Sequence, residues 1–201
     1  MAASGRLRLF CALRLADETI APVVRWQERE LRGGRIVPPA HLHLTLAFLG
    51  AQDAAAVPAV AGALRAAAGG AGHIRLHLRG YRETRSVAML TFGDEGGEGA
   101  ALADRLAGAL EALDLYRREA RPWLPHLTVL RFGERPRLRP PLPELGDVVP
   151  SDAAVFMSRL RPPLPELGEV APSDAAVFMS RLRPHGAEYD VLEAVSLKPH
   201  R

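Results

Sequence analysis

The chain has 201 residues, of which 48% are hydrophobic, so it is long enough for one domain with a substantial core. It has no apolar run of membrane-spanning length, no apolar segment of signal-peptide length at its start and a single cysteine, Cys11. These features exclude a membrane helix, an internal disulfide and a cysteine-based metal cage, and they favour a cytoplasmic protein. The net charge is +3, and Lys198 is the only lysine among 26 basic residues, an arginine excess that we attribute to coding bias.

The apolar patterns predict helices that alternate with strands along the chain. Helices are expected from Asp17 to the glycine pair at 33–34, from Asp53 to about Ala68, and after the glycine pair at 96–97 through the leucines at 102, 106, 110 and 113. Strands are expected at 8–15, 35–37, through His43 to Gly50, and at 74–79, 86–92, 126–132 and 189–197. Because hairpin signals also occur, we favour an α+β fold with antiparallel sheets over a doubly wound parallel sheet.

A 22-residue unit is repeated in tandem near the end of the chain. Residues 139–160 and 161–182 differ only at Asp147/Glu169 and Val149/Ala171. Two copies are too few for a solenoid, so we interpret them as a duplicated loop and strand. We predict that the second copy's strand, 175–182, fills the place beside the last strand, because the shorter connection costs less entropy to close. The first copy would then be a looped insertion or an added edge strand.

Two copies of a short motif are the strongest functional signal. His43-Leu44-Thr45-Leu46 and His126-Leu127-Thr128-Val129 share the pattern His-x-Thr-apolar and lie 83 residues apart. In a strand, residues two apart point to the same face, so each histidine projects with its threonine. A neutral imidazole accepts a proton, a protonated one donates it, and a hydroxyl can donate to a phosphate oxygen. Two such motifs facing each other therefore suit phosphodiester chemistry without a metal.

Spacing alone leaves three questions open: whether the motifs are catalytic or structural, whether they hold a metal, and which way Arg131 faces. A single His-x-Thr in a strand is more often structural than catalytic, and only the pairing changes this balance. His41 shares a face with His43, so His41, His43 and His126 could form a three-imidazole metal site, although no carboxylate lies nearby in the sequence to complete it. Arg131 lies five residues after His126, which is the opposite face of an unbroken strand, unless a β-bulge or the strand end turns it back.

The chain resembles the 2H phosphoesterase superfamily, and within it the bacterial RNA 2′,3′-cyclic phosphodiesterases, also called 2′-5′ RNA ligases. The resemblance rests on the stretches 8–13, 37–50, 121–131 and 180–189, which include both motifs. It implies one bilobal α+β domain over residues 1–201, with two antiparallel sheets forming a central cleft and helices on the outside. The duplicated unit at 139–182 has no counterpart in this family that we can name.

The resemblance also implies an activity, the hydrolysis of a 2′,3′-cyclic phosphate at an RNA end to a 2′-phosphate and a 3′-hydroxyl, with no cofactor. His126 would be the general base and His43 the general acid, while Thr45, Thr128 and Arg131 would bind the phosphate. The two histidine roles could be exchanged, since the sequence does not orient the substrate. The chain departs from the family at 87–90, where an aromatic residue able to stack on a base is common and Val-Ala-Met-Leu stands here.

Three functions are therefore weighed. The first is cyclic phosphodiesterase activity on RNA or oligonucleotide ends, with 2′-5′ joining as a minor reverse reaction. The second is hydrolysis of a small cyclic nucleotide phosphate, and the third is a module that binds RNA ends without turnover. Both histidines and both threonines are present, which argues against the third. We expect a monomer whose partner is RNA with a 2′,3′-cyclic phosphate end and which does not bind a membrane.

Overall fold

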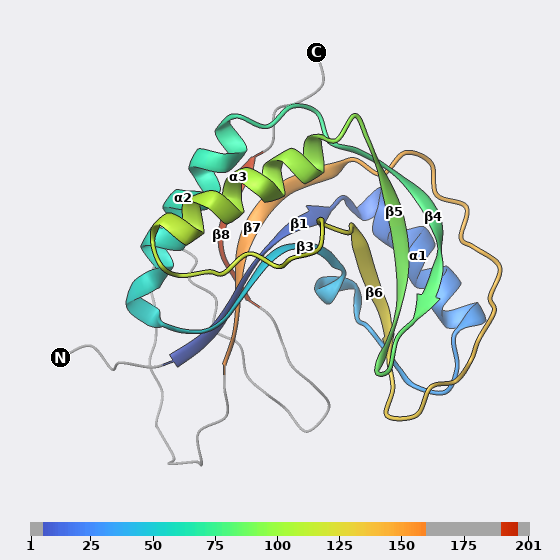
Figure 1. The fold of residues 1–201 in the computed structure, drawn as a ribbon. Coiled ribbons are helices and arrows are strands. Elements are labelled where there is room, and N and C mark those ends of the chain that lie inside the picture. Colours follow the sequence, from blue (N-terminus) through green and yellow to red (C-terminus); the bar gives the residue numbers. More distant parts are fainter. Residues whose placement is uncertain (1–5, 160–189, 197–201) are drawn as a thin grey trace, which may run out of the picture.

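A computed structural model describes residues 6–159 and 190–196 as one curled antiparallel sheet of eight strands with three α-helices (Figure 1). Seven strands follow one path, in the order β4 (Arg75–Glu83), β5 (Val87–Glu95), β6 (His126–Arg131), β3 (His43–Asp53), β1 (Arg6–Leu15), β7 (Pro150–Arg159) and β8 (Asp190–Ser196). The short strand β2 (Arg35–Ile36) pairs with β6 off this path. The predicted α+β class is confirmed.

The prediction of two separate sheets is wrong, because the two groups of strands are joined through the strands that carry the motifs. β3 and β6 form one backbone pair, Leu44 with Leu127, and diverge on either side of it. A sheet that is continuous at only one pair can bend sharply there, which is consistent with the curled shape in Figure 1. The cleft therefore lies on one folded sheet.

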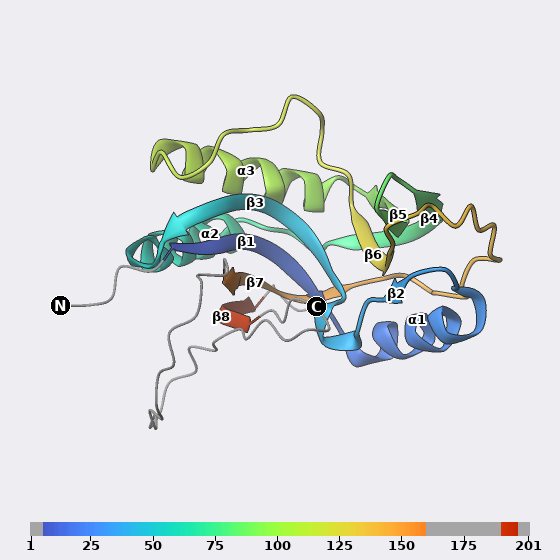
Figure 2. The ribbon, with the colours of Figure 1, turned by 90° about the horizontal axis from the view of Figure 1, so that it is seen from below.

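The helices cover this sheet at its two ends. α2 (Val57–Gly69) packs on β7 and β8, and α3 (Glu98–Ala112) packs beside α2 and reaches β3 and β5 (Figure 2). The leucines at 102, 106 and 110 are fully buried, as their spacing along one helix face predicts. α1 (Asp17–Glu30) lies at the other end, where the Trp26 ring is 6.2 Å from that of Tyr81 on β4. Two short 3₁₀ helices, Pro39–His41 and Ala54–Ala56, precede β3 and α2.

The duplicated unit enters the sheet with its first copy, contrary to the prediction. β7 belongs to that copy and is an inner strand, paired with β1 on one side and β8 on the other. The residues just before it are already fixed, since Val148 pairs with Leu76 and the Trp26 indole donates to the Pro141 carbonyl at 2.6 Å. Closing a longer loop costs only about 0.6 kcal/mol per doubling, so the loop entropy on which the prediction rested decides little between the two copies. The second copy, with its predicted strand at 175–182, lies outside the described residues.

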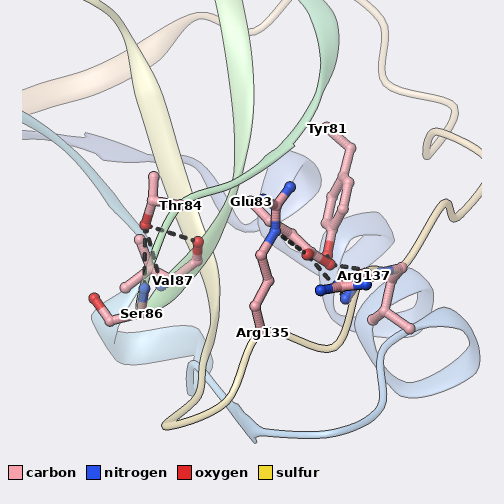
Figure 3. Close-up of polar contacts among 8 residues, drawn as sticks. Tyr81, Glu83, Thr84, Ser86, Val87, Arg135 and Arg137 are labelled. Atoms are coloured by element: carbon pink, nitrogen blue, oxygen red, sulfur yellow. Dashed lines mark hydrogen bonds and ion pairs between the residues drawn. The ribbon is translucent and has the colours of Figure 1, made fainter.

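The segment that follows β6 is held against β4 by a buried carboxylate. Glu83 accepts hydrogen bonds from the Arg135 side chain and from the backbone N–H groups of Arg137 and Leu138 (Figure 3). The same figure shows the turn between β4 and β5, where Thr84 bonds with Val87 and Ser86. The Glu83 contacts fix the segment that follows β6, the strand that carries the second motif, and the Thr84 contacts fix the turn that precedes its neighbour β5.

Candidate functional site

A cavity of about 440 Å³, here called the motif pocket, lies over the junction of β3 and β6. All five residues singled out in the sequence line it: His43, Thr45, His126, Thr128 and Arg131. The other walls come from β1, the segment 35–41, β5 and the later part of β3, and they include Arg8, Phe10, Arg35, His41, Phe48 and Val87. The structure therefore brings the two motifs into one pocket, as their matching patterns led us to expect.

The two motifs meet at their middle residues. Leu44 is the second residue of the first motif and Leu127 is the second residue of the other, and these two form the single pair between β3 and β6. Because the strands are antiparallel, this register sets His43 beside Thr128 and Thr45 beside His126. Leu44 and Leu127 are fully buried on the opposite face, so the core fixes the register of the polar face.

A β-bulge at the last residue of each motif reverses the expected facing of the residues beyond it. In β6, Thr128 pairs with Met89 and Leu130 with Ala88, which leaves Val129 as the extra residue. In β3, Leu46 is the extra residue in the pairing with β1. The bulge occupies the fourth motif position in both strands. As a result, Phe48 and Arg131, which each lie five places after a motif histidine, face the motif pocket. Arg131 therefore lies on the pocket side, which spacing alone could not decide.

Gln27 of α1 contacts the bulge in β6 through hydrogen bonds. The only sign of this role in the sequence is that a polar residue stands on the apolar face of a predicted helix. Its side chain is fully buried, and its Nε2 donates to the carbonyls of Val129 at 2.8 Å and Val37 at 3.1 Å. The Val37 N–H also donates to the Val129 carbonyl, at 3.1 Å. The bulge turns the Val129 carbonyl toward α1, and these two donors satisfy it.

Replacing Gln27 with leucine is expected to lower the free energy of unfolding by about 1–3 kcal/mol, because the buried Val37 carbonyl loses its side-chain donor and Val129 keeps only one. Urea denaturation measures this difference. Glu28→Leu, at the exposed neighbouring position of α1, is the matched control and is expected to change stability by less than about 0.5 kcal/mol. Equal stability of Gln27→Leu and wild type would show that strand pairing alone holds the bulge.

His43 sits against two aromatic rings. Its ring centroid lies 4.9 Å from that of Phe10 and 5.2 Å from that of Phe156, and these two phenylalanines stack on each other at 4.9 Å. Burial lowers the pKa of His43 to about 4, the charges of Arg131 and His126 act in the same direction, and a hydrogen bond to the backbone of His41 opposes them. Phe156 belongs to the first copy of the repeat, so β7 forms part of the site.

His126 is oriented by the backbone. Its Nδ1 lies 2.9 Å from the Leu124 carbonyl oxygen, which can only accept, so Nδ1 carries a proton and Nε2 is left for proton transfer. The segment before β6 is tied to the first motif, since the Trp123 indole N–H donates to the Thr45 carbonyl at 2.8 Å. One loop therefore positions His126 and fastens it to the strand that carries His43.

Three arginines make the motif pocket electropositive. Arg131 and Arg35 are direct cross-strand partners of the β6–β2 pair, and both line the pocket. Arg8 lies at the rim, with its guanidinium 5.3 Å from the Phe48 ring centroid. Guanidinium groups that line a pocket in this way are suited to bind an anion. Arg131 could be singled out from the sequence, whereas Arg8 and Arg35 were missed because their strands carry no motif.

The alternative of a metal site is not supported by the geometry. His41, His43 and His126 all lie within the described ranges, and no group of three or more His, Cys, Asp or Glu side chains in these ranges is arranged to hold a metal ion. Among the same residues, no helix is both long and apolar enough to cross a membrane.

The fold and the paired motifs define a family. A profile of the 2′-5′ RNA ligase superfamily matches residues 15–164. The chain belongs to this superfamily, the 2H phosphoesterases. It is 33% identical to the RNA 2′,3′-cyclic phosphodiesterase of Thermus thermophilus over 149 residues, which cover 68% of this chain and 74% of that protein.

Solved structures share the same fold. The apo structure of E. coli LigT matches with a TM-score of 0.71 at 20% identity, covering 98% of this chain and all of that one. E. coli LigT complexed with 3′-AMP also gives 0.71 at 20% identity, covering 96% and 99% of the two chains. The Thermus thermophilus protein TT0787 gives 0.69 at 27% identity, covering 94% and 97%.

Proposed function

We propose that the protein hydrolyses 2′,3′-cyclic phosphates at the ends of RNA or oligonucleotides, without a metal, to leave a 2′-phosphate. The observation that carries this proposal is the meeting of two His-x-Thr motifs at their middle residues, in a pocket that also holds three arginines. Two imidazoles suit one acid and one base, and the arginines suit an anion. The 33%-identical relative that bears the name RNA 2′,3′-cyclic phosphodiesterase supports the same reaction.

The proposed reaction needs one proton taken and one given. One imidazole removes a proton from water, whose oxygen attacks phosphorus. The bond between phosphorus and the 3′-oxygen breaks, and the other imidazole, entering protonated, gives its proton to the 3′-oxygen. Thr45 and Thr128 donate to the non-bridging oxygens, and Arg131 balances the charge that grows on them. The register of β3 against β6, with Thr45 opposite His126 and Thr128 opposite His43, supports a role for one hydroxyl beside each imidazole.

The test of the proposal is a hydrolysis assay on an oligonucleotide that ends in a 2′,3′-cyclic phosphate, run with excess EDTA. We expect full activity with the chelator and a 2′-phosphate product, which phosphorus NMR distinguishes from a 3′-phosphate. Loss of activity in EDTA would overturn the metal-free mechanism. A 3′-phosphate product would overturn the assignment of the broken bond, and no hydrolysis by the wild-type protein would overturn the function itself.

The pH dependence of kcat/KM is expected to show an ionisation near pH 4 that belongs to His43 in the free protein, because burial lowers its pKa to about 4. At pH 7 this imidazole is neutral. If His43 is the base, kcat/KM falls as pH drops through about 4, since the proton blocks acceptance. If His43 is the acid, kcat/KM falls as pH rises above about 4, and the limb in kcat lies at higher pH, because the bound anion favours the protonated ring.

The same measurement therefore assigns the two roles. The ionisation near pH 4 should vanish in His43→Gln, which keeps a polar side chain of similar size but does not titrate in this range. A His43 ionisation at its ordinary value of about 6.5 would contradict the buried environment described above.

A further inference from the structure

A second cavity of about 820 Å³, here called the side groove, adjoins the motif pocket. Thr45, Phe48 and His126 are walls of both. A ligand seated at the two histidines can therefore extend into the side groove along shared walls. The side groove is the larger of the two cavities, and the acid–base chemistry proposed above makes no use of it.

Part of the side groove's wall is apolar and offers flat surfaces. α3 contributes a strip of four alanines, at 100, 101, 103 and 107, which leaves the groove wide. On the other walls, the Phe48 and Leu124 side chains are 48% and 38% exposed and are therefore open to a ligand. Trp123 lines the same groove, held by its bond to the Thr45 carbonyl. Exposed apolar and aromatic surfaces of this kind stack on nucleobases.

The charged residues around the side groove favour a backbone with negative charges. Three arginines and two acids line it: Arg82, Arg118, Arg121, Asp104 and Glu119. Arg118 pairs with Asp104, and Arg121 pairs with Glu119 at 2.6 Å, so these four residues nearly neutralise one another. Arg82 makes no ion pair within the described part of the chain and supplies the net positive charge. The side groove therefore offers one uncompensated arginine for the phosphodiester of a nucleotide and neighbouring stacking surfaces for its base.

We propose that the side groove binds the nucleotide that precedes the cyclic-phosphate end of an RNA substrate. This inference rests on the proposed function. An RNA strand that ends in a 2′,3′-cyclic phosphate continues only through the 5′-oxygen of its last ribose, so a single adjoining groove is enough to hold the strand. The preceding base would lie against Phe48 and Leu124, and its phosphodiester would lie near Arg82. The protein would then favour oligonucleotide ends over free cyclic mononucleotides.

The experiment compares kcat/KM for adenosine 2′,3′-cyclic phosphate with that for the dinucleotide ApA carrying the same cyclic end. For the wild-type protein, the dinucleotide value is expected to be higher by roughly 5- to 150-fold, the worth of stacking one base. Ala100→Trp fills the groove from an exposed helix position and should reduce that ratio to near one by lowering the dinucleotide value. Ala112→Trp, at an exposed alanine of the same helix outside both cavities, should leave the ratio unchanged.

A second pair of variants keeps the test independent of the tryptophan. Arg82→Ala should lower the dinucleotide value selectively, whereas Arg85→Ala, at an exposed arginine outside the groove, should not. Equal wild-type kcat/KM for the two substrates, or equal losses on both substrates in Ala100→Trp and Arg82→Ala, would overturn the inference while leaving the proposed function intact. Hydrolysis of neither substrate by the wild-type protein would instead overturn the proposed function.

Discussion

Removing either motif histidine is expected to lower kcat for cyclic-phosphate hydrolysis by roughly 10²–10⁴-fold, the usual worth of one positioned acid or base. The variants should be His43→Gln and His126→Ala. Glutamine is chosen at 43 because that ring packs against Phe10 and Phe156, and truncation to alanine would leave a cavity whose cost could be mistaken for lost catalysis. His126 is more open, so alanine is acceptable there. The measurement is single-turnover hydrolysis of an oligonucleotide with a 2′,3′-cyclic phosphate end.

The control and the double variant sharpen this prediction. His77→Ala removes an imidazole of β4 that lines neither cavity, and it should retain wild-type kcat. If the two imidazoles work in one concerted proton transfer, the double variant should lose much less than the product of the two single losses. Full activity in either single variant would refute a two-histidine site. Retained binding of the oligonucleotide with no turnover even in the wild-type protein would favour a module that only binds RNA ends.

The sequence could predict which motif residues share one pocket, but it could not predict how Arg131 faces that pocket. Alternation along a strand groups His43 with Thr45 and His126 with Thr128, and the structure lines one pocket with all four. The same rule places Arg131 on the wrong face, because it assumes an unbroken strand. The bulge at Val129 contains no glycine that would indicate it in the sequence, and its carbonyl accepts a hydrogen bond from Gln27, which is 102 residues away.

Residues that act on the site through tertiary contacts also could not be predicted from the sequence. Phe10 and Phe156 lie on β1 and β7, and only the neighbouring positions of these strands in the sheet bring their rings to His43. The prediction of two sheets failed for a related reason, since a single pair between Leu44 and Leu127 joins the strand groups and a hydrophobic pattern does not reveal one pair. The choice between the two repeat strands failed because their sequences are identical and it rested on loop entropy alone, which changes by only about 0.6 kcal/mol per doubling of loop length.

The second large effect is expected at Glu83, whose side chain is only 2% exposed. Its carboxylate accepts from the Tyr81 hydroxyl at 3.0 Å, Arg135 Nε at 3.0 Å, Arg137 N at 3.0 Å and Leu138 N at 2.7 Å (Figure 3). Glu83→Ala leaves the two backbone N–H groups without this acceptor. Breaking a buried pair costs about 3–5 kcal/mol, and we expect the low end because the Arg135 side chain is 56% exposed and can be rehydrated. That is a large part of the stability of a typical domain.

Chemical denaturation at several pH values tests whether the negative charge of Glu83, as well as its hydrogen bonds, contributes to stability. Burial by itself would raise the pKa of Glu83, but the hydrogen bonds from Leu138, Arg135, Tyr81 and Arg137 outweigh it and lower the pKa. A carboxyl with a lowered pKa in the folded state stabilises the protein above its unfolded pKa of about 4.3, and this contribution is lost as pH falls through the folded pKa. As pH falls below 5, the free energy of unfolding should therefore decrease more for the wild-type protein than for Glu83→Gln. Glu134→Gln, one residue before the anchored segment and exposed, should behave like the wild type. Parallel pH curves for the wild type and Glu83→Gln would mean that the carboxylate charge contributes nothing and that the network acts only through its geometry.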